Sequence, residues 1–302
     1  NYRFDALVNF MPLNQIRGVN KLFTTVNDKL PDGGIWICCY EPQSVTKRNI
    51  LKRFPPLIGW LYYVAFFCYK RVLPKLLMTS RLYFDITEGK DRVLSKAEVL
   101  GRLCYCGFEI IDERKKGDLN ERGARRKLRP EIAVRHLYGI LVKLNRVGKN
   151  GKMFKVYKFR TMHPYSEFLQ AYIYDRYSLQ EGGKFNHDIR VTTLGRWMRK
   201  CWVDELPMLL NLIKGDMKLV GVRPISKHYF SLYSKELQET RTRHMPGLLP
   251  PFYADMPKTL DEIEASEMRY LTMCEERGTF VTDVIYFWRI FYTIVFKRAR
   301  SH

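Results

Sequence analysis

The chain has 302 residues and a formal net charge of +21, with 52 Lys and Arg against 31 Asp and Glu. Its hydrophobic content of 46% excludes wholesale disorder. The sequence has no stretch of about 20 uncharged apolar residues, which argues against a polytopic membrane protein. The length favours two domains, and the excess of cations predicts an anionic partner: nucleic acid, anionic lipid or a phosphorylated substrate.

The first forty residues alternate between strand and helix patterns. Residues 4–10 predict a short buried strand, and residues 15–30 carry apolar side chains at helical spacing. The turn signal PDGG at 31–34 separates this helix from a core strand predicted over 35–40. The chain starts at Asn1 rather than Met, which is compatible with further sequence upstream.

An apolar run at residues 55–69 is bracketed by pairs of Lys and Arg. It is too short for a straight transmembrane helix, so it predicts a buried helix, an interfacial helix or a re-entrant segment. Further on, Ser95 and Glu98 form a capping box that opens a helix to about Cys106, and residues 107–111 follow as a strand.

Residues 112–131 are dense in charge and poor in apolar side chains. We interpret them as a domain boundary, which gives an N-terminal part over 1–115 and a C-terminal part over 130–302.

The second part opens with a predicted β-hairpin. Its turn is GKNG at 148–151, between strands over 140–147 and 153–160. Lys158 and Arg160 are two residues apart, so we expect both cations on one face of the strand.

Two later segments predict helices. One starts at Asp204, and its apolar residues recur at i, i+3, i+4 and i+7 before Lys214 and Gly215 end it. The other runs from Asp283 to about Arg300 and carries one narrow polar stripe on an aromatic-rich apolar cylinder: Tyr286, Arg289, Thr293, Lys297 and Arg300. Such a helix can lie in a membrane interface or dock on a core.

Asp204 and Glu205 stand at a predicted helix N-terminus with many cations nearby in the sequence. Helix N–H groups and cations stabilise a carboxylate there and attract a diphosphate, which allows carboxylate attack on phosphorus. A divalent cation would neutralise negative charge between the carboxylate and the diphosphate. The alternative is a plain N-cap at Asp204 and an exposed acid at Glu205, with Lys158 and Arg160 on a solvated strand face.

Residues 152–162 (KMFKVYKFRTM) resemble the K-F-R-T-M signature of the bacterial sugar transferase family, the monotopic phosphoglycosyl transferases. Other motifs of this family match in order along the chain, at 146–152 (RVGKNGK), 195–196 (GR), 204–207 (DELP), Asn211, 214–217 (KGDM), 220–221 (VG), 223–224 (RP) and 246–247 (PG). The resemblance covers about half of the chain.

The resemblance implies transfer of a sugar-1-phosphate from a nucleotide diphosphate sugar, such as a UDP-sugar, to polyprenyl (undecaprenyl) phosphate. This reaction would start exopolysaccharide, capsule or O-antigen assembly. Asp204 would be the nucleophile, and Glu205 would assist with Mg²⁺ or with a proton, so both acids are the expected metal ligands. The candidate phosphate-binding residues are Lys158, Arg160, Arg190, Arg199, Arg223 and Arg241.

Two features depart from the family pattern. Val222 replaces the usual Pro before Arg223, and charged residues over 112–137 stand where the re-entrant helix is expected. The anchor would then be the run at 55–69 or the C-terminal helix with the basic surface. We expect the cytoplasmic face of a bacterial inner membrane, where Lys and Arg meet anionic lipid.

The first half resembles the C-terminal portion of a Rossmann-type methyltransferase, on residues 30–42 and 95–110. It lacks a Gly-rich cofactor loop, so we expect a structural remnant rather than an S-adenosylmethionine-dependent enzyme with a basic tail. The expected fold is therefore α/β, a partial Rossmann-like unit followed by a membrane-associated transferase domain with amphipathic helices. No nucleic-acid motif accompanies the charge, and the sequence allows oligomerisation.

Overall fold

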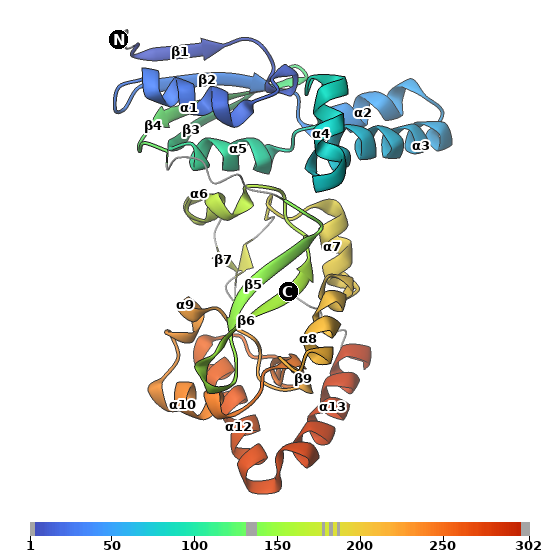
Figure 1. Cartoon of the computed structure of the whole chain (residues 1–302), viewed down its shortest axis with the longest axis vertical. Helices are drawn as coiled ribbons and strands as arrows, with labels where there is room; N and C mark the ends of the chain where they lie inside the picture. The colour runs from blue at the N-terminus through green and yellow to red at the C-terminus, as the bar shows by residue number, and fades with distance from the viewer. Residues whose placement is uncertain (1–3, 131–137, 177–178, 181–183, 186–187, 297–302) are drawn as a thin grey trace. The chain divides into compact units, whose positions relative to one another are not determined.

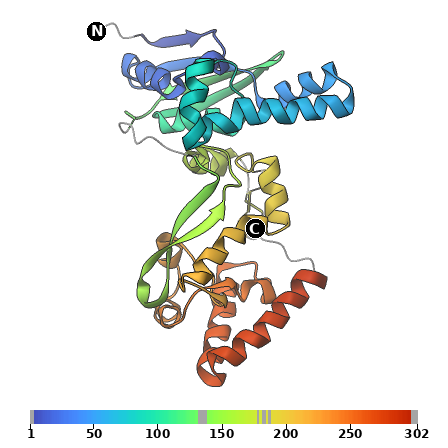
Figure 2. The ribbon, with the colours of Figure 1, turned by 45° about the vertical axis from the view of Figure 1, so that its right-hand side comes forward.

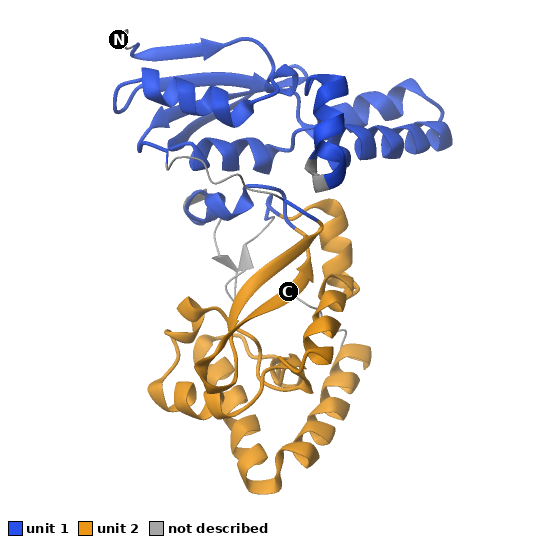
Figure 3. Cartoon of the chain, in the orientation of Figure 1, with its two compact units in different colours: residues 1–139, 162–177, 187–190 blue, residues 140–161, 178–186, 191–302 orange. Residues whose placement is uncertain are grey.

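The computed structural model (Figures 1 and 2) describes residues 4–130, 138–176, 179–180, 184–185 and 188–296. The chain folds as a mixed α/β protein with two compact units (Figure 3). The first unit contains residues 1–139, 162–177 and 187–190, and the second contains 140–161, 178–186 and 191–302. The units differ from the predicted parts because the first unit extends to residue 139 and takes in a later segment.

The first unit consists of a small sheet, helices and the segment that returns to it. In chain order its elements are β1 (Ala6–Asn9), η1 (Leu13–Gln15), α1 (Val19–Lys29), β2 (Ile35–Tyr40), α2 (Gln43–Arg53), α3 (Pro56–Phe67), the π-helical turn η2 (Cys68–Val72), η3 (Leu73–Lys75), α4 (Leu77–Thr87), α5 (Lys96–Tyr105), β3 (Phe108–Lys116), β4 (Leu119–Arg126), η5 (Ser166–Leu169) and α6 (Gln170–Arg176).

The sheet has the strand order β1-β2-β4-β3. β1 and β2 are parallel and joined through α1, whereas β4 runs antiparallel to both of its neighbours. The parallel pair with its connecting helix is a feature that a Rossmann-like unit requires, and the inserted β4 is not part of an all-parallel sheet. The partial Rossmann-like assignment stays a prediction.

The charged stretch at 112–131 is not the boundary that we predicted, because it forms most of β3 and β4. Its arginines pair inside the sheet: Arg122 is 2% exposed and donates to the Tyr40 hydroxyl at 3.1 Å. Arg126 is also buried and donates to the Leu30 carbonyl. Each guanidinium has a hydrogen-bond acceptor for a terminal nitrogen, although the two Nε atoms have no hydrogen-bond partner among the described residues. A strand rich in charge can lie inside a sheet when it finds such acceptors, and composition does not reveal them.

The core of the first unit lies between the sheet and helices α1 and α5. The helix over 15–30, the strand over 35–40 and the capped helix from Ser95 are confirmed, since the Ser95 Oγ accepts from the Glu98 N–H at 3.2 Å. The strand at 4–10 exists as β1 but is not buried, and Val8 is 48% exposed. β1 is an edge strand, which explains its exposure.

The apolar run at 55–69 forms α3, which packs along α2; both views show this pair extending from the sheet (Figures 1 and 2). The buried-helix alternative is wrong, because Leu57 is 75% and Leu61 is 66% exposed. An interfacial or re-entrant position remains compatible with this exposure.

The second unit contains the predicted hairpin and the helices that follow it. Its elements are β5 (Leu141–Val147), η4 (Lys149–Gly151), β6 (Met153–Phe159), β7 (Leu179–Gln180), β8 (Lys184–Phe185), α7 (Thr193–Lys200), η6 (Val203–Met208), α8 (Leu209–Ile213), β9 (Lys218–Val220), α9 (Lys227–Phe230), α10 (Lys235–Arg243), β10 (Gly247–Leu249), α11 (Phe252–Asp255), α12 (Leu260–Arg277) and α13 (Thr279–Phe296).

The predicted hairpin is confirmed. β5 and β6 pair antiparallel in a register from Leu141↔Phe159 to Val147↔Met153. Asn150 adopts the left-handed conformation (φ 56°) in the turn, a conformation that Asn tolerates.

The terminal helix is confirmed as α13, and two residues of its polar stripe face the protein, whereas Arg289 is exposed. Tyr286 is 1% and Thr293 is 4% exposed, whereas the apolar Trp288 is 62% exposed. Lys297 and Arg300, the last members of the predicted stripe, lie outside the described residues. Among the described residues, α13 is the one helix long and apolar enough to cross a membrane, by length and composition only.

A buried carboxylate makes the first unit sensitive to one substitution. Glu98 is 1% exposed and pairs with Arg71 at 3.1 Å and with Arg102 at 2.9 Å. Glu98→Gln should lower the free energy of unfolding by about 3–5 kcal/mol, because it removes the compensating charge from the buried Arg71 and the largely buried Arg102. Urea unfolding followed by circular dichroism measures this loss. The control is Glu109→Gln, whose exposed pair with Lys127 contributes about 1 kcal/mol or less. Equal losses in both variants would contradict the prediction.

Candidate active site

The two acids predicted to react lie in a tight helical turn of the second unit. Trp202 has a left-handed backbone (φ 61°), and η6 then leads directly into α8. The sequence predicted one helix here, and the structure makes its first part a 3-10 helix. Pro207 lies within that part and has no N–H to donate in an α-helical hydrogen bond, which favours the tighter form.

This helix buries its polar residues and exposes its apolar ones. Asp204, Glu205 and Asn211 are 5%, 8% and 0% exposed. The apolar residues at helical spacing lie outside and are 46–83% exposed: Leu206, Leu209, Leu210 and Ile213. The two carboxylates therefore face the protein, where η6 packs on β6.

Lys158 on β6 pairs with the second acid. Its Nζ donates to Glu205 Oε1 at 2.6 Å. Arg160 lies just beyond β6, with its backbone N–H bonded to the Ile140 carbonyl at 2.7 Å and its side chain half-buried. Lys158 therefore makes a defined contact with the acidic turn and does not lie on a solvated strand face.

Asp204 lies in an environment that disfavours its charge. Burial raises the pKa of its carboxyl, and the charge of Glu205 adds to this, while Lys158 and Arg199 act in the opposite direction. Its Oδ1 accepts no hydrogen bond from the described residues. A buried carboxylate oxygen without a partner is unusual, and it is available to a ligand.

Arg199 completes a group that we call the Asp204 cluster: Asp204, Glu205, Lys158 and Arg199. Arg199 comes from α7, and its Nε donates to the Thr161 Oγ at 3.0 Å. The cluster therefore joins three elements, η6, β6 and α7, and holds two acids and two cations.

The other predicted phosphate-binding residues have different surroundings. Arg190 belongs to the first unit, where it bonds to Asp188 and Gln170. Arg223 follows β9, and its guanidinium lies 5.6 Å from the centre of the Phe252 ring.

Arg241 lies in the core at 3% exposure, where it pairs with Glu267 and donates to the Arg223 carbonyl. The placement does not support Arg241 as a phosphate ligand, because Glu267 already neutralises its charge. It supports the Arg223 backbone instead.

Sequence reasoning assigned no role to two residues that position the cluster. The Asn211 side chain accepts from the Tyr157 N–H at 3.2 Å and donates to the Lys155 carbonyl at 2.8 Å, so it fixes α8 to β6. Thr161 holds Arg199. The sequence did contain a signal for Asn211, because it is a polar residue seven positions after Asp204 and therefore on the same helix face.

The chemistry of the acids fits Mg²⁺. Among the described residues no group of three or more His, Cys, Asp and Glu forms a metal site. However, Mg²⁺ in phosphate-transfer sites is held by one or two carboxylates and by substrate phosphates. Asp204, with its unpartnered oxygen, and Glu205 are the residues that would hold it.

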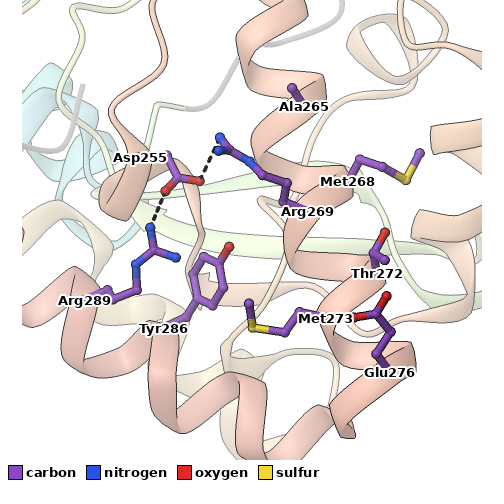
Figure 4. Close-up of a pocket in the computed structure, with 9 residues that line it drawn as sticks. All are labelled: Asp255, Ala265, Met268, Arg269, Thr272, Met273, Glu276, Tyr286 and Arg289. Atoms are coloured by element: carbon purple, nitrogen blue, oxygen red, sulfur yellow. Dashed lines mark hydrogen bonds and ion pairs between the residues drawn. The ribbon is translucent and has the colours of Figure 1, made fainter.

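A cavity elsewhere in the second unit contains none of the predicted site residues. It lies between α11, α12 and α13 and has a volume of about 420 Å³ (Figure 4). Asp255 stands in it between Arg289, at 2.8 Å, and Arg269, at 3.6 Å. Asp255 is therefore already paired with both of these cations, which leaves neither of them as an obvious partner for an anionic ligand.

Comparisons with known proteins place the site in a recognised segment. A family model, described as bacterial sugar transferase, matches residues 131–297. The chain is 38% identical over 108 residues to UDP-N-acetylgalactosamine-undecaprenyl-phosphate N-acetylgalactosaminephosphotransferase of Aeromonas hydrophila, covering 34% of this chain and 23% of that protein. It is 41% identical over 97 residues to undecaprenyl-phosphate galactose phosphotransferase of Salmonella typhimurium (30% and 20%).

A third relative is shorter. The exopolysaccharide production protein ExoY of Sinorhizobium fredii is 40% identical over 108 residues, which cover 34% of this chain and 47% of that protein. The match thus spans less than half the length of each of these relatives.

Because the pKa of Asp204 is raised, we expect a substitution that removes the charge of its carboxylate to stabilise the folded state. Between the usual value of 3.8 and the raised pKa, the native state binds more protons than the unfolded state, so stability falls as pH rises through this interval. Asp204→Asn should therefore raise the melting temperature at pH 7 by about 2–4 °C, and the gain should shrink as pH falls towards 4.

The control is Asp261→Asn, at an exposed first-turn position of α12, which should shift melting by about 1 °C or less. Calorimetry of both variants across pH makes the comparison. A lower melting temperature for Asp204→Asn at pH 7, or a gain independent of pH, would contradict the prediction.

Proposed function

The chain belongs to the bacterial sugar transferase family, and from this premise we propose that it transfers a sugar-1-phosphate from a UDP-sugar to undecaprenyl phosphate. Two relatives are named for phosphotransferase reactions that involve undecaprenyl phosphate. A third is named for exopolysaccharide production. The product would therefore start the assembly of an exopolysaccharide, a capsule or an O-antigen.

The observation that carries the proposal is the buried oxygen of Asp204, which has no hydrogen-bond partner among the described residues and lies near two cations. In the first step this oxygen attacks the phosphorus that bears the sugar. The bond from this phosphorus to the bridging oxygen breaks, and the nucleoside monophosphate leaves with the electron pair. Asp204 then carries the phospho-sugar as an acyl phosphate.

In the second step an oxygen of undecaprenyl phosphate attacks the same phosphorus. The bond to Asp204 breaks, and the carboxylate returns as the lipid diphosphate sugar forms. Lys158 and Arg199 compensate negative charge that develops on the phosphoryl oxygens. Glu205, held by Lys158 at 2.6 Å, would take up a proton from the attacking phosphate if that phosphate arrives protonated.

Mg²⁺ bound at Asp204 and Glu205 would neutralise the diphosphate and supply Lewis-acid chemistry. The remaining candidates of the second unit, Arg160 and Arg223, would contact the nucleotide phosphates or the lipid phosphate. Arg190 lies in the first unit and bonds to Asp188 and Gln170. The family match and the relatives described above give no support to the methyltransferase alternative.

The inverted helices of the second unit support a position at a membrane. α8 buries Asn211 and exposes its apolar residues, which is the reverse of a helix on a water-soluble surface. α13 buries Tyr286 and Thr293 and exposes several large apolar side chains together with Arg289. On α7, Leu194 is 64% and Trp197 is 55% exposed, next to Arg196 and Lys200. Apolar side chains flanked by cations suit the anionic cytoplasmic leaflet, and nucleotide sugars are cytosolic.

The nucleophile is tested by mass. Incubating the full chain with Mg²⁺ and a panel of UDP-sugars without acceptor should add one sugar-phosphate to Asp204. Asp204→Asn should show no adduct and lose turnover by about a thousandfold or more. Asp261→Asn is the matched control and should keep both. Wild-type turnover in Asp204→Asn, or an adduct on another residue, would refute the assignment.

The membrane position is tested on the outer face of α13. Trp288 and Phe291 are 62% and 48% exposed, so the double change Trp288→Glu with Phe291→Glu should leave the fold intact. The affinity for vesicles should fall about tenfold or more, because binding would no longer transfer two apolar side chains from water into the lipid. Co-sedimentation with phosphatidylglycerol-containing vesicles measures this. Leu232→Glu, at 50% exposure outside α7, α8 and α13, is the control; equal binding by both variants would contradict the proposal.

A further inference from the structure

Three of the matched sequence motifs, at 220–221, 223–224 and 246–247, meet around Arg223 inside the second unit. β9 and β10 pair in parallel, and the Gly247 N–H donates to the Val222 carbonyl at 2.9 Å. The two strands approach closely, since a Cβ on Gly247 would lie 2.1 Å from the Gly221 nitrogen. The backbone that leads to Arg223 is therefore fixed against β10.

The chain is held again just after Arg223. The N–H of Val147, the last residue of β5, donates to the Ile225 carbonyl at 3.0 Å. Ile225 is 6% exposed and belongs to the core of the second unit. Arg223 lies between these two attachments and is itself exposed, so its side chain can reach a ligand from a fixed stretch of backbone.

A buried ion pair contacts the backbone of Arg223 from two other helices. Arg241 on α10 is 3% exposed, and Glu267 on α12 is 1% exposed. Nη1 of Arg241 donates to Glu267, and Nη2 donates to the Arg223 carbonyl. Burial raises the pKa of Glu267, whereas the charge of Arg241 and the backbone N–H of Arg223 act in the opposite direction. The pair thus contacts both polar groups of the Arg223 backbone.

Stability alone does not require this ion pair. Burial of two charges carries a desolvation cost, and apolar residues in place of a buried ion pair often give an equally stable or more stable protein. Apolar residues, however, cannot bond to the carbonyl and the N–H of Arg223 in fixed directions. This difference indicates that the pair of Arg241 and Glu267 serves to fix the geometry at Arg223.

The surroundings of the Arg223 side chain favour an anion. Its guanidinium lies 5.6 Å from the centre of the Phe252 ring. Burial lowers the pKa of Arg146 on β5, and the charge of Arg223 lowers it further, so the two cations lie near enough to repel one another. A phosphate group between them would relieve this repulsion, because its oxygens accept hydrogen bonds from both guanidinium groups.

We propose that Arg241 and Glu267 are positioning residues for the transfer reaction: through the backbone of Arg223 they hold its guanidinium where it binds, together with Arg146, a phosphate group of a substrate. All of these residues belong to the second unit. The effect on turnover rests on the proposed function, whereas the effect on the Arg223 backbone does not.

The first test is Arg241→Lys in the full chain, with Arg243→Lys as the matched control. Lysine at 241 keeps a charge beside Glu267 but lacks the fork that also reaches the Arg223 carbonyl. Arg243 lies on the same helix with its side chain 68% exposed. Hydrogen–deuterium exchange over residues 221–226 should be faster in Arg241→Lys than in the control, and kcat/KM should fall about tenfold or more. Exchange equal to that of the control would overturn the proposal.

A double-mutant cycle separates positioning from a general structural role. Arg223→Ala should lower kcat/KM by about thirtyfold or more. Adding Arg241→Lys should then change kcat/KM by less than about threefold, because the side chain that it positions is gone. Multiplication of the two losses would contradict the positioning role.

A second variant covers the case in which Arg241→Lys does not fold. Arg241→Met combined with Glu267→Leu removes both buried charges together, so its melting temperature should equal or exceed that of the wild type. Its kcat/KM should still fall about tenfold or more, because Arg223 has lost both backbone contacts. A folded double variant with turnover within about twofold of the wild type would refute the proposal.

The KM values identify the phosphate that binds. A rise in the KM of the UDP-sugar in Arg223→Ala assigns it to the nucleotide diphosphate, and a rise in the KM of undecaprenyl phosphate assigns it to the lipid. Arg146→Gln should raise the same KM, whereas Lys143→Gln, which removes an equal charge from the opposite face of β5, should not. Equal KM values in these two variants would exclude Arg146 from the site. If the wild-type chain shows no transfer, the proposed function fails, and exchange over residues 221–226 alone decides the positioning role.

Discussion

The second unit depends on burying two adjacent carboxylates against a strand that carries a lysine. Glu205 accepts directly from Lys158, and one oxygen of Asp204 has no hydrogen-bond partner in the part of the chain that the structure describes. Asn211 holds the same helix to the backbone of β6, so the acids cannot turn towards water without breaking this packing. Burial makes the charge of Asp204 costly, and the two nearby cations partly offset that cost.

This constraint explains the unusual outer surface of the second unit. If the polar face of α8 is turned inward, its leucines have to face outward, and α13 repeats the arrangement with Tyr286 and Thr293 inside. The polar groups that face inward find hydrogen-bond partners within the protein. The apolar groups that face outward are removed from water only when an apolar surface covers them. The lipid surface that we proposed for this unit would cover them in this way.

The first unit also buries charged side chains, and it compensates them with hydrogen-bond acceptors and with opposite charges. Arg122 and Arg126 enter the sheet because a hydroxyl and a carbonyl accept from them, and Glu98 compensates Arg71 and Arg102 inside the unit. These groups hold their neighbours in fixed directions, since hydrogen bonds to charged groups depend strongly on geometry. The unit is thus suited to holding a segment such as 162–177 in one position.

The sequence by itself determined the local structure and the family: the hairpin at 148–151, the cap at Ser95 and the ordered motifs around Asp204 all depend on neighbouring residues. Tertiary structure decided which way each helix faces, that the charged stretch after Ile111 is a pair of strands, that Arg241 belongs to the core, and that 162–177 joins the first unit. Helical spacing tells that a helix has two faces, but which face turns inward depends on partners far away in the chain, because only they can satisfy a buried charge.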